Sequence, residues 1–290
     1  MKPLRIGTEL PVRRALLSRG PVEYRLDRRG PRTVVILHGG HMRAGLALGE
    51  EVFAAEDCTV LVPSRPGYGG TPLTADGTPA GFADRVAELC GRLGIGQAEA
   101  VVGISAGGPT AVALAARHPR LASRLVLMSA VGPLPWPDAR TRLAARIGFH
   151  PAVEGAVWGI VGQLLRVAPG TGLRLLLRDL TTLPGRDVVA GLRLDEREKL
   201  LELFSRLRSG AGFVNDLVPV PGLTAQVEVP VLVIASRRDG SVPFAHAEAL
   251  AAMRHAQLWE SDANSHFVWF GDGWEETAAR VRAFLDTPEV

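Results

Sequence analysis

Hydrophobic residues follow two alternating patterns along the first third of the chain. Uninterrupted apolar runs rich in Val, Ile and Leu occupy residues 33–37, 59–62 and 100–104, and a glycine-containing turn follows each of them. Such runs are typical of strands that are buried on both faces of a parallel sheet. Between the second and third runs, residues 81–93 carry apolar side chains at helical spacing. The pattern therefore predicts strands that alternate with helices.

The same alternation continues towards the end of the chain. Further apolar runs predict strands at residues 125–128, 231–235 and 256–259. Amphipathic stretches predict helices at residues 106–117, 244–253 and 274–285. Strands and helices in this order are typical of an open, mostly parallel sheet flanked by helices, so the predicted fold class is α/β.

One long segment departs from this pattern. Residues 133–229 contain no convincing strand pattern and instead show arginine-rich amphipathic stretches, such as 139–147 and 192–207. Prolines mark the entry and the exit of the segment, where they favour rigid, non-helical connections. We therefore predict a helical cap at residues 133–229, inserted into a core formed by residues 1–132 and 230–290.

Composition and charge narrow the classes of function. The chain is 47% hydrophobic and 22% charged, which is near the globular average and excludes disordered and collagen-like proteins. Its net charge is only +3, and the arginines are scattered among acidic residues rather than clustered as in a nucleic-acid-binding face. No apolar stretch has the length of a membrane span, and the two cysteines are too few for a disulfide framework. We expect a soluble cytoplasmic protein that binds neither nucleic acid nor membranes.

A candidate nucleophile lies where the strand 100–104 gives way to a helix of small residues. The sequence there is Gly103-Ile104-Ser105-Ala106-Gly107. In a nucleophile elbow, the serine occupies a sharp strand-to-helix turn, and glycines two positions away on each side avoid clashes at close approach. Small residues could also serve tight packing alone, but the strand before and the helix after favour a catalytic Ser105.

Serine needs a base and an orienting carboxylate, in the chain order Ser, Asp, His. Asp239 follows the predicted strand 231–235, which places its carboxylate at the sheet edge where ligands bind. Asp262 and Asp216 are weaker candidates, because the first is only four residues before the proposed histidine and the second belongs to the insertion. His266 follows the strand 256–259 on a polar loop and is the predicted base.

An oxyanion hole needs two converging backbone amides. The amide of Ala106 would be one donor. Glycines follow the strand 33–37, and the amide of Gly40 is the predicted second donor, with that of His41 a near alternative. His38 and His41 could also be a metal pair, but no nearby carboxylate completes a ligand set, so we predict no metal.

Taken together, these motifs resemble the α/β-hydrolase superfamily in their order and spacing. The resemblance implies an eight-stranded sheet, a Ser/His/Asp triad and a helical cap after the sixth strand. Ser236 and Ser265 stand where the family often has glycine, which weakens assignment to one subfamily. Serine at 105 argues against the branch with an aspartate nucleophile. The matching segments are His38-Gly39-Gly40, Ser64-Arg65-Pro66-Gly67-Tyr68-Gly69, Gly103-Ile104-Ser105-Ala106-Gly107-Gly108, Arg238-Asp239-Gly240-Ser241-Val242-Pro243 and Ser265-His266.

The predicted function is therefore that of a carboxylesterase-like serine hydrolase without a cofactor, acting on a small or medium, largely apolar substrate. Aminopeptidase-like, thioester or carbon–carbon bond hydrolysis stays open, as does a small-molecule receptor with negligible turnover. The oligomeric state is left open. Aromatic side chains of the cap and residues near the catalytic loops could line the pocket, although ordinary packing would also explain them. These candidates are His41, Trp136, Phe149, Trp158, Phe204, Phe213 and Phe267.

Overall fold

The computed structural model describes residues 6–220, 222, 226–271 and 273–287. Its centre is one eight-stranded sheet with the strand order β1-β2-β4-β3-β5-β6-β7-β8. The β1–β2 and β2–β4 pairs are antiparallel, and the other pairs are parallel. The α/β class and the mostly parallel eight-stranded sheet are thus confirmed. The strands are β1 (Arg13–Leu17), β2 (Gly20–Asp27), β3 (Thr33–Leu37), β4 (Thr59–Pro63), β5 (Ala100–Ile104), β6 (Leu125–Met128), β7 (Val231–Ala235) and β8 (Ala256–Glu260).

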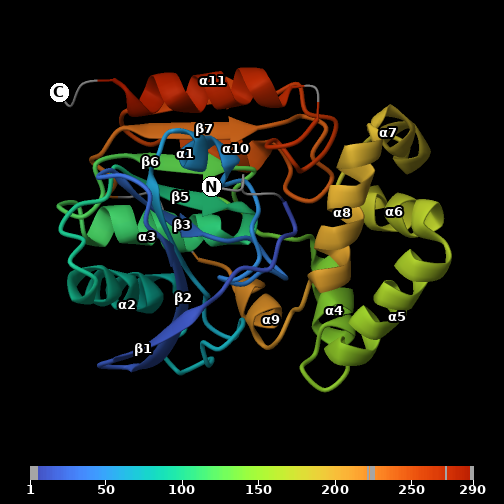
Figure 1. The fold of residues 1–290 in the computed structure, drawn as a ribbon, viewed down its shortest axis with the longest axis horizontal. Helices are drawn as coiled ribbons and strands as arrows, with labels where there is room; N and C mark the ends of the chain where they lie inside the picture. Colours follow the sequence, from blue (N-terminus) through green and yellow to red (C-terminus); the bar gives the residue numbers. More distant parts are fainter. Residues whose placement is uncertain (1–5, 221, 223–225, 272, 288–290) are drawn as a thin grey trace.

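Helices cover both faces of the sheet (Figure 1). On one face α1 and α11 pack in one apolar core, and on the other α2, α3 and α10 pack in a second. The pleat of β5 serves both cores, because Val102 and Ile104 join the first and Val101 joins the second. The five helices are α1 (Glu51–Ala55), α2 (Pro79–Arg92), α3 (Gly108–Arg117), α10 (Ala245–Ala251) and α11 (Trp274–Leu285).

In the described part of the segment between β6 and β7, six further helices occur within the range predicted as a cap. We call them the inserted helices. In Figure 1, α4 to α8 form a group to one side of the sheet, whereas α9 lies closer to the core. None of the helices in the described part of the chain is long and apolar enough to cross a membrane. The inserted helices are α4 (Ala139–Gly148), α5 (Glu154–Val167), α6 (Pro169–Arg178), α7 (Gly185–Gly191), α8 (Leu194–Arg206) and α9 (Gly212–Asp216).

The first two strands and α1 are not predicted from the sequence. β1 is a largely exposed edge strand, so it lacks the apolar run that marks the buried strands. β2 is interrupted by Arg25, which is only 1% exposed. Its guanidinium is paired with Glu50 and Asp27, and this pairing makes a buried charge tolerable inside a strand. A five-residue helix such as α1 is too short to show a periodic pattern.

Glu51, in the first turn of α1, has a carboxyl group with one unsatisfied oxygen. Its Oε2 atom is enclosed and has no hydrogen bond to any described residue. Burial raises the pKa of Glu51 from 4.5 to about 7, and the neighbouring charge of Glu50 acts in the same direction. The unfolded chain therefore loses this proton first, and the free energy of unfolding falls as the pH rises from about 4.5 to about 7.

We expect Glu51→Gln to remove the fall in the free energy of unfolding that accompanies the ionisation of Glu51. The free energy of unfolding at pH 8 should rise by about 1–3 kcal/mol, because glutamine keeps the shape of the neutral acid and carries no charge at any pH. At pH 4 the two proteins should be nearly equal in stability. Urea denaturation at both pH values measures the difference, and an effect of equal size at both would contradict the assignment.

Candidate active site

Ser105 occupies the turn between β5 and α3. Its φ angle is 51°, in the left-handed region that serine rarely adopts, and such strain is concentrated at functional sites. Glycine is needed on both sides of this turn. A Cβ atom at Gly103 would lie 2.9 Å from the Cα of Gly108, and one at Gly107 would lie 2.1 Å from the carbonyl oxygen of Leu37. The structure therefore places Ser105 in the strand–turn–helix context that the motif predicts.

Asp239 and His266 form a buried pair at the ends of two neighbouring strands. Asp239 follows β7 and His266 follows β8, and the Nδ1 atom of His266 lies 2.7 Å from Oδ2 of Asp239. The other carboxylate oxygen of Asp239 accepts hydrogen bonds from the amides of Ser241 and Val242, at 2.7 and 2.9 Å. Three hydrogen bonds hold the carboxylate in place. With Nδ1 bound to it, Nε2 is the ring nitrogen of His266 that is left for proton exchange.

Ser105 and His266 line the same cavity, which has a volume of about 540 Å³. The sequence-predicted pocket residues contribute to its wall with one exception. Trp158 does not line it; its indole Nε1 donates to Ser209 Oγ at 2.9 Å and its ring contacts that of His41. Core residues that the sequence did not single out, such as Trp269, also line the wall. The predicted residues that do line the cavity are His41, Trp136, Phe149, Phe204, Phe213 and Phe267.

The loop after β3 passes directly beside the serine. A Cβ atom at Gly39 would lie 3.2 Å from the Cβ of Ser105, and Gly40 lines the cavity. Within the described residues, the amides of Gly40 and Ala106 donate to no other protein group. Both amides are therefore free to donate to a substrate oxygen, as an oxyanion hole requires.

The loops that carry Asp239 and His266 are tied together. Ser236 Oγ donates to the carbonyl of Ala263 at 2.5 Å and accepts from the amide of Arg238 at 3.0 Å. The serine that departs from the usual glycine at this position therefore links the two loops.

Residues 180–182, in the connection between α6 and α7, contact both the loop that carries Asp239 and the loop that carries His266. The amide of His266 donates to the carbonyl of Leu180 at 2.7 Å, and Thr181 Oγ1 donates to the carbonyl of Asn264 at 2.6 Å. The amide of Thr182 donates to the carbonyl of Arg238 at 2.9 Å. Sequence reasoning missed this segment, because nothing local marks contacts between residues so far apart in the chain.

The two rival carboxylates do not bind His266. Asp216, in α9, forms a bidentate ion pair with Arg65, and the hydroxyl of Tyr68 donates to it at 2.5 Å. The backbone carbonyl of Asp262 accepts a hydrogen bond from the guanidinium of Arg238. The carboxylate of Asp262 makes no hydrogen bond with a described residue. Asp239 is thus the carboxylate that the fold brings to the histidine.

His38 is structural rather than a metal ligand. Its Nδ1 donates to the carbonyl of Gly39 at 2.8 Å, and its Nε2 accepts from the amide of Arg65 at 3.0 Å. Burial lowers the pKa of His38 well below 6.5, so the ring is neutral. Both ring nitrogens are occupied, and in the described ranges no group of three metal-binding side chains occurs.

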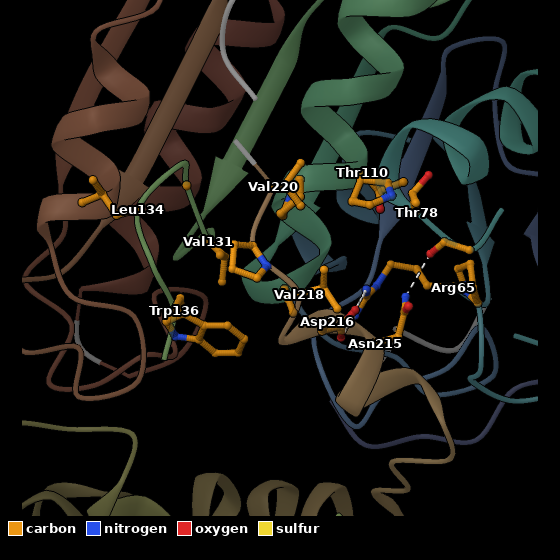
Figure 2. A pocket seen from close by; sticks show the side chains of 17 residues that line it. Arg65, Thr78, Thr110, Val131, Leu134, Trp136, Asn215, Asp216, Val218 and Val220 are labelled. Atoms are coloured by element: carbon orange, nitrogen blue, oxygen red, sulfur yellow. Dashed lines mark hydrogen bonds and ion pairs between the residues drawn. The ribbon is translucent and has the colours of Figure 1, made fainter. Parts of the chain in front are cut away.

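Figure 2 shows a smaller cavity of about 190 Å³, which shares Trp136 with the first one. Its paired polar residues lie at one end: Arg65 binds Asp216, and Asn215 donates to the carbonyl of Gly77. Trp136 lies at the other end and also lines the larger cavity. Its indole Nε1 donates to the carbonyl of Ser241 at 2.7 Å, which fixes the ring between the two spaces.

Comparison with known proteins decides the family. The sequence profile described as "Alpha/beta hydrolase family" matches residues 34–280. The chain belongs to the alpha/beta hydrolase family. This hydrolase is 29% identical over 275 residues to a Bacillus subtilis (strain 168) protein named "Uncharacterized hydrolase YcgS", an alignment that covers 92% of the chain and 96% of the relative.

Solved structures agree on the fold of this alpha/beta hydrolase. An alpha/beta hydrolase fold protein from Nakamurella multipartita superposes with a TM-score of 0.78 at 27% identity, over 95% of this chain and 99% of that chain. A thermophilic esterase from Thermogutta terrifontis superposes with a TM-score of 0.66 at 18% identity, over 95% and 98% of the two chains. The predicted family and fold are therefore confirmed.

Proposed function

We propose that this alpha/beta hydrolase is a serine hydrolase that cleaves an ester-like bond of a small or medium, largely apolar substrate through an acyl-enzyme. The observation that carries the proposal is the position of Ser105. It occupies a strained turn at φ 51°, in the same cavity as a histidine that is bound to a buried aspartate at 2.7 Å. Nucleophile, base and orienting carboxylate are the parts that this chemistry needs.

The reaction follows from these groups. His266 Nε2 accepts the Ser105 proton as Oγ attacks the substrate carbonyl carbon, and the carbonyl oxygen becomes an oxyanion held by the amides of Gly40 and Ala106. When the tetrahedral intermediate collapses, the bond to the alcohol breaks and His266 returns the proton to the leaving oxygen. Water then repeats the sequence on the acyl-enzyme and releases the acid. Asp239 orients the imidazole and stabilises its protonated form.

The cavity supports the substrate class. Aromatic rings such as Trp136, Phe213 and Phe267 line it, so it favours apolar acyl or alcohol groups. Its volume of about 540 Å³ suits a small or medium ligand. The esterase named on the solved Thermogutta terrifontis structure is in keeping with an ester substrate. Turnover of matched esters, thioesters and aminoacyl amides distinguishes the possible bond types.

The test is covalent labelling with a fluorophosphonate probe. We expect stoichiometric modification of Ser105, located by peptide mass analysis, because the probe reports a serine activated by a base. A hydrolase-like receptor with an inactive serine would not be labelled. The variant Ser105→Ala should lose the modification, and labelling that persists in this variant would refute the assignment.

Thr181→Val probes the contact between the inserted helices and the histidine loop. Valine keeps the shape of threonine but cannot donate to the carbonyl of Asn264. We expect kcat for a p-nitrophenyl ester to fall about 10-fold, because small misplacements of a catalytic group are costly. Valine also cannot accept from the amide of Leu183, so two hydrogen bonds are lost and the free energy of unfolding should fall by about 1–3 kcal/mol. Thr171→Val, at an exposed position of α6, is the control, and equal kcat values in the two variants would contradict a positioning role.

A further inference from the structure

His41 lies at the contact between the core and the inserted helices. It follows Gly40 on the loop after β3, with a φ angle of 60°. Its ring is surrounded by three aromatic side chains of the insertion: the ring centroids of Phe213, Phe149 and Trp158 lie 3.9, 4.7 and 5.2 Å away. The imidazole is thus held in one position in the wall of the cavity that contains Ser105.

The hydroxyl of Ser209 determines which ring nitrogen of His41 carries the proton. Ser209 is 0% exposed, and its Oγ accepts the indole N–H of Trp158, which can only donate. Oγ also lies 2.8 Å from Nδ1 of His41, and no other acceptor for the serine proton is present among the described residues. A buried hydroxyl proton without an acceptor is costly, so Ser209 donates to Nδ1. The ring proton of His41 is therefore on Nε2.

The Nε2 atom of His41 is open to the cavity. It has no hydrogen-bond partner among the described residues, and it is not one of the enclosed polar atoms without a partner, whereas the indole nitrogen of Trp269 is. Burial lowers the pKa of His41 to about 3, and the charge of Arg65 acts in the same direction. At neutral pH the ring is therefore uncharged and presents a single N–H donor to the cavity.

We propose that His41 is a specificity-determining residue, whose Nε2–H donates to a neutral oxygen acceptor of the substrate, such as a ketone, ether or lactone-ring oxygen. The inference rests on the proposed hydrolase function and adds a substrate class to it, namely oxo- or alkoxy-substituted esters. An aliphatic group at this place would leave the N–H without a partner in an aromatic wall. Sites built to hydrogen-bond a substrate oxygen discriminate against analogues that lack it.

The experiment uses pairs of p-nitrophenyl esters that differ by one acceptor: 4-oxopentanoate with 4-methylpentanoate, and methoxyacetate with butanoate. For each pair, the ratio of kcat/KM values is measured in the wild-type protein and in variants, so that intrinsic reactivity cancels. In His41→Phe we expect the ratio for at least one pair to fall about 5- to 10-fold, the size of one hydrogen bond. In His41→Gln, whose amide N–H can replace the donor, the ratio should recover.

Nitrogen NMR of the wild-type protein tests the proton position without any substitution. We expect the His41 signals to show an unprotonated Nδ1 and a protonated Nε2; the reverse pattern would overturn the inference. Ester ratios that are equal in wild type, His41→Phe and His41→Gln would also overturn it, while the hydrolase proposal would stand. If no substrate of the panel is turned over and the fluorophosphonate leaves Ser105 unmodified, the hydrolase proposal fails and this inference falls with it.

Discussion

Replacing Ser105 with alanine is expected to lower kcat for p-nitrophenyl ester hydrolysis by about 10⁴- to 10⁶-fold, the range found when a triad nucleophile is removed. Alanine has no oxygen to attack the carbonyl, so no acyl-enzyme forms. The amides of Gly40 and Ala106 and the cavity would remain, and they would support only a small residual rate. Because serine already carries a Cβ at φ 51°, alanine adds no strain, and the variant should fold normally.

Two comparisons make this result specific. Ser205→Ala changes an exposed serine of α8 outside the cavity wall and should keep wild-type turnover. His266→Ala should lose nearly as much activity as Ser105→Ala, and the double variant should lose little more, because members of a triad act as one unit. Losses that multiply in the double variant would contradict a shared mechanism. Retention of wild-type turnover by Ser105→Ala would refute it outright.

The sheet could be predicted from the sequence wherever strands are buried on both faces. β3, β5, β6 and β7 consist almost entirely of buried apolar residues, and their predicted bounds agree with the structure. β1 could not be predicted, because this exposed edge strand begins with two arginines and has no apolar run, whereas β8, the other edge strand, carries Leu258 and Trp259 and could be predicted. The interior of β2 contains Arg25, whose burial depends on Glu50, far along the chain, and no local pattern reveals such a partner.

The residues of the candidate site also divide into those that the sequence predicts and those that it does not. Ser105, Asp239 and His266 could be proposed because each follows a recognisable strand, and the parallel sheet brings those strand ends to one edge. Thr181 and Ser209 could not be proposed. Their roles depend on hydrogen bonds to Asn264 and His41, which are 83 and 168 residues away in the sequence. The aromatic ring of Trp158 is the reason to predict it in the cavity wall. In the structure its indole N–H donates to Ser209 Oγ, and the side chain does not line the cavity.

Among the described residues, one buried ion pair joins the inserted helices to the core in addition to the hydrogen bonds above, and we expect its disruption to lower stability more than any other substitution proposed. Arg65, on the loop after β4, and Asp216, in α9, have side chains that are only 3% and 7% exposed. We expect Asp216→Asn to lower the free energy of unfolding by about 3–5 kcal/mol, because it leaves the Arg65 charge buried without its counter-charge. Tm should fall by roughly 10 °C, measured by scanning calorimetry.

A second bidentate arginine–aspartate pair provides the control for burial. Arg117 binds Asp84 through two hydrogen bonds of 2.9 and 2.8 Å, but these side chains are 48% and 30% exposed. Asp84→Asn should therefore cost no more than about 1 kcal/mol, since solvent screens an exposed pair. The double variant Arg65→Met/Asp216→Leu should recover much of the stability lost in Asp216→Asn, because it removes both buried charges together. Equal losses of stability in Asp84→Asn and Asp216→Asn would mean that burial of the Arg65–Asp216 pair does not determine its effect. A double variant less stable than Asp216→Asn would mean that the two charges themselves stabilise the contact.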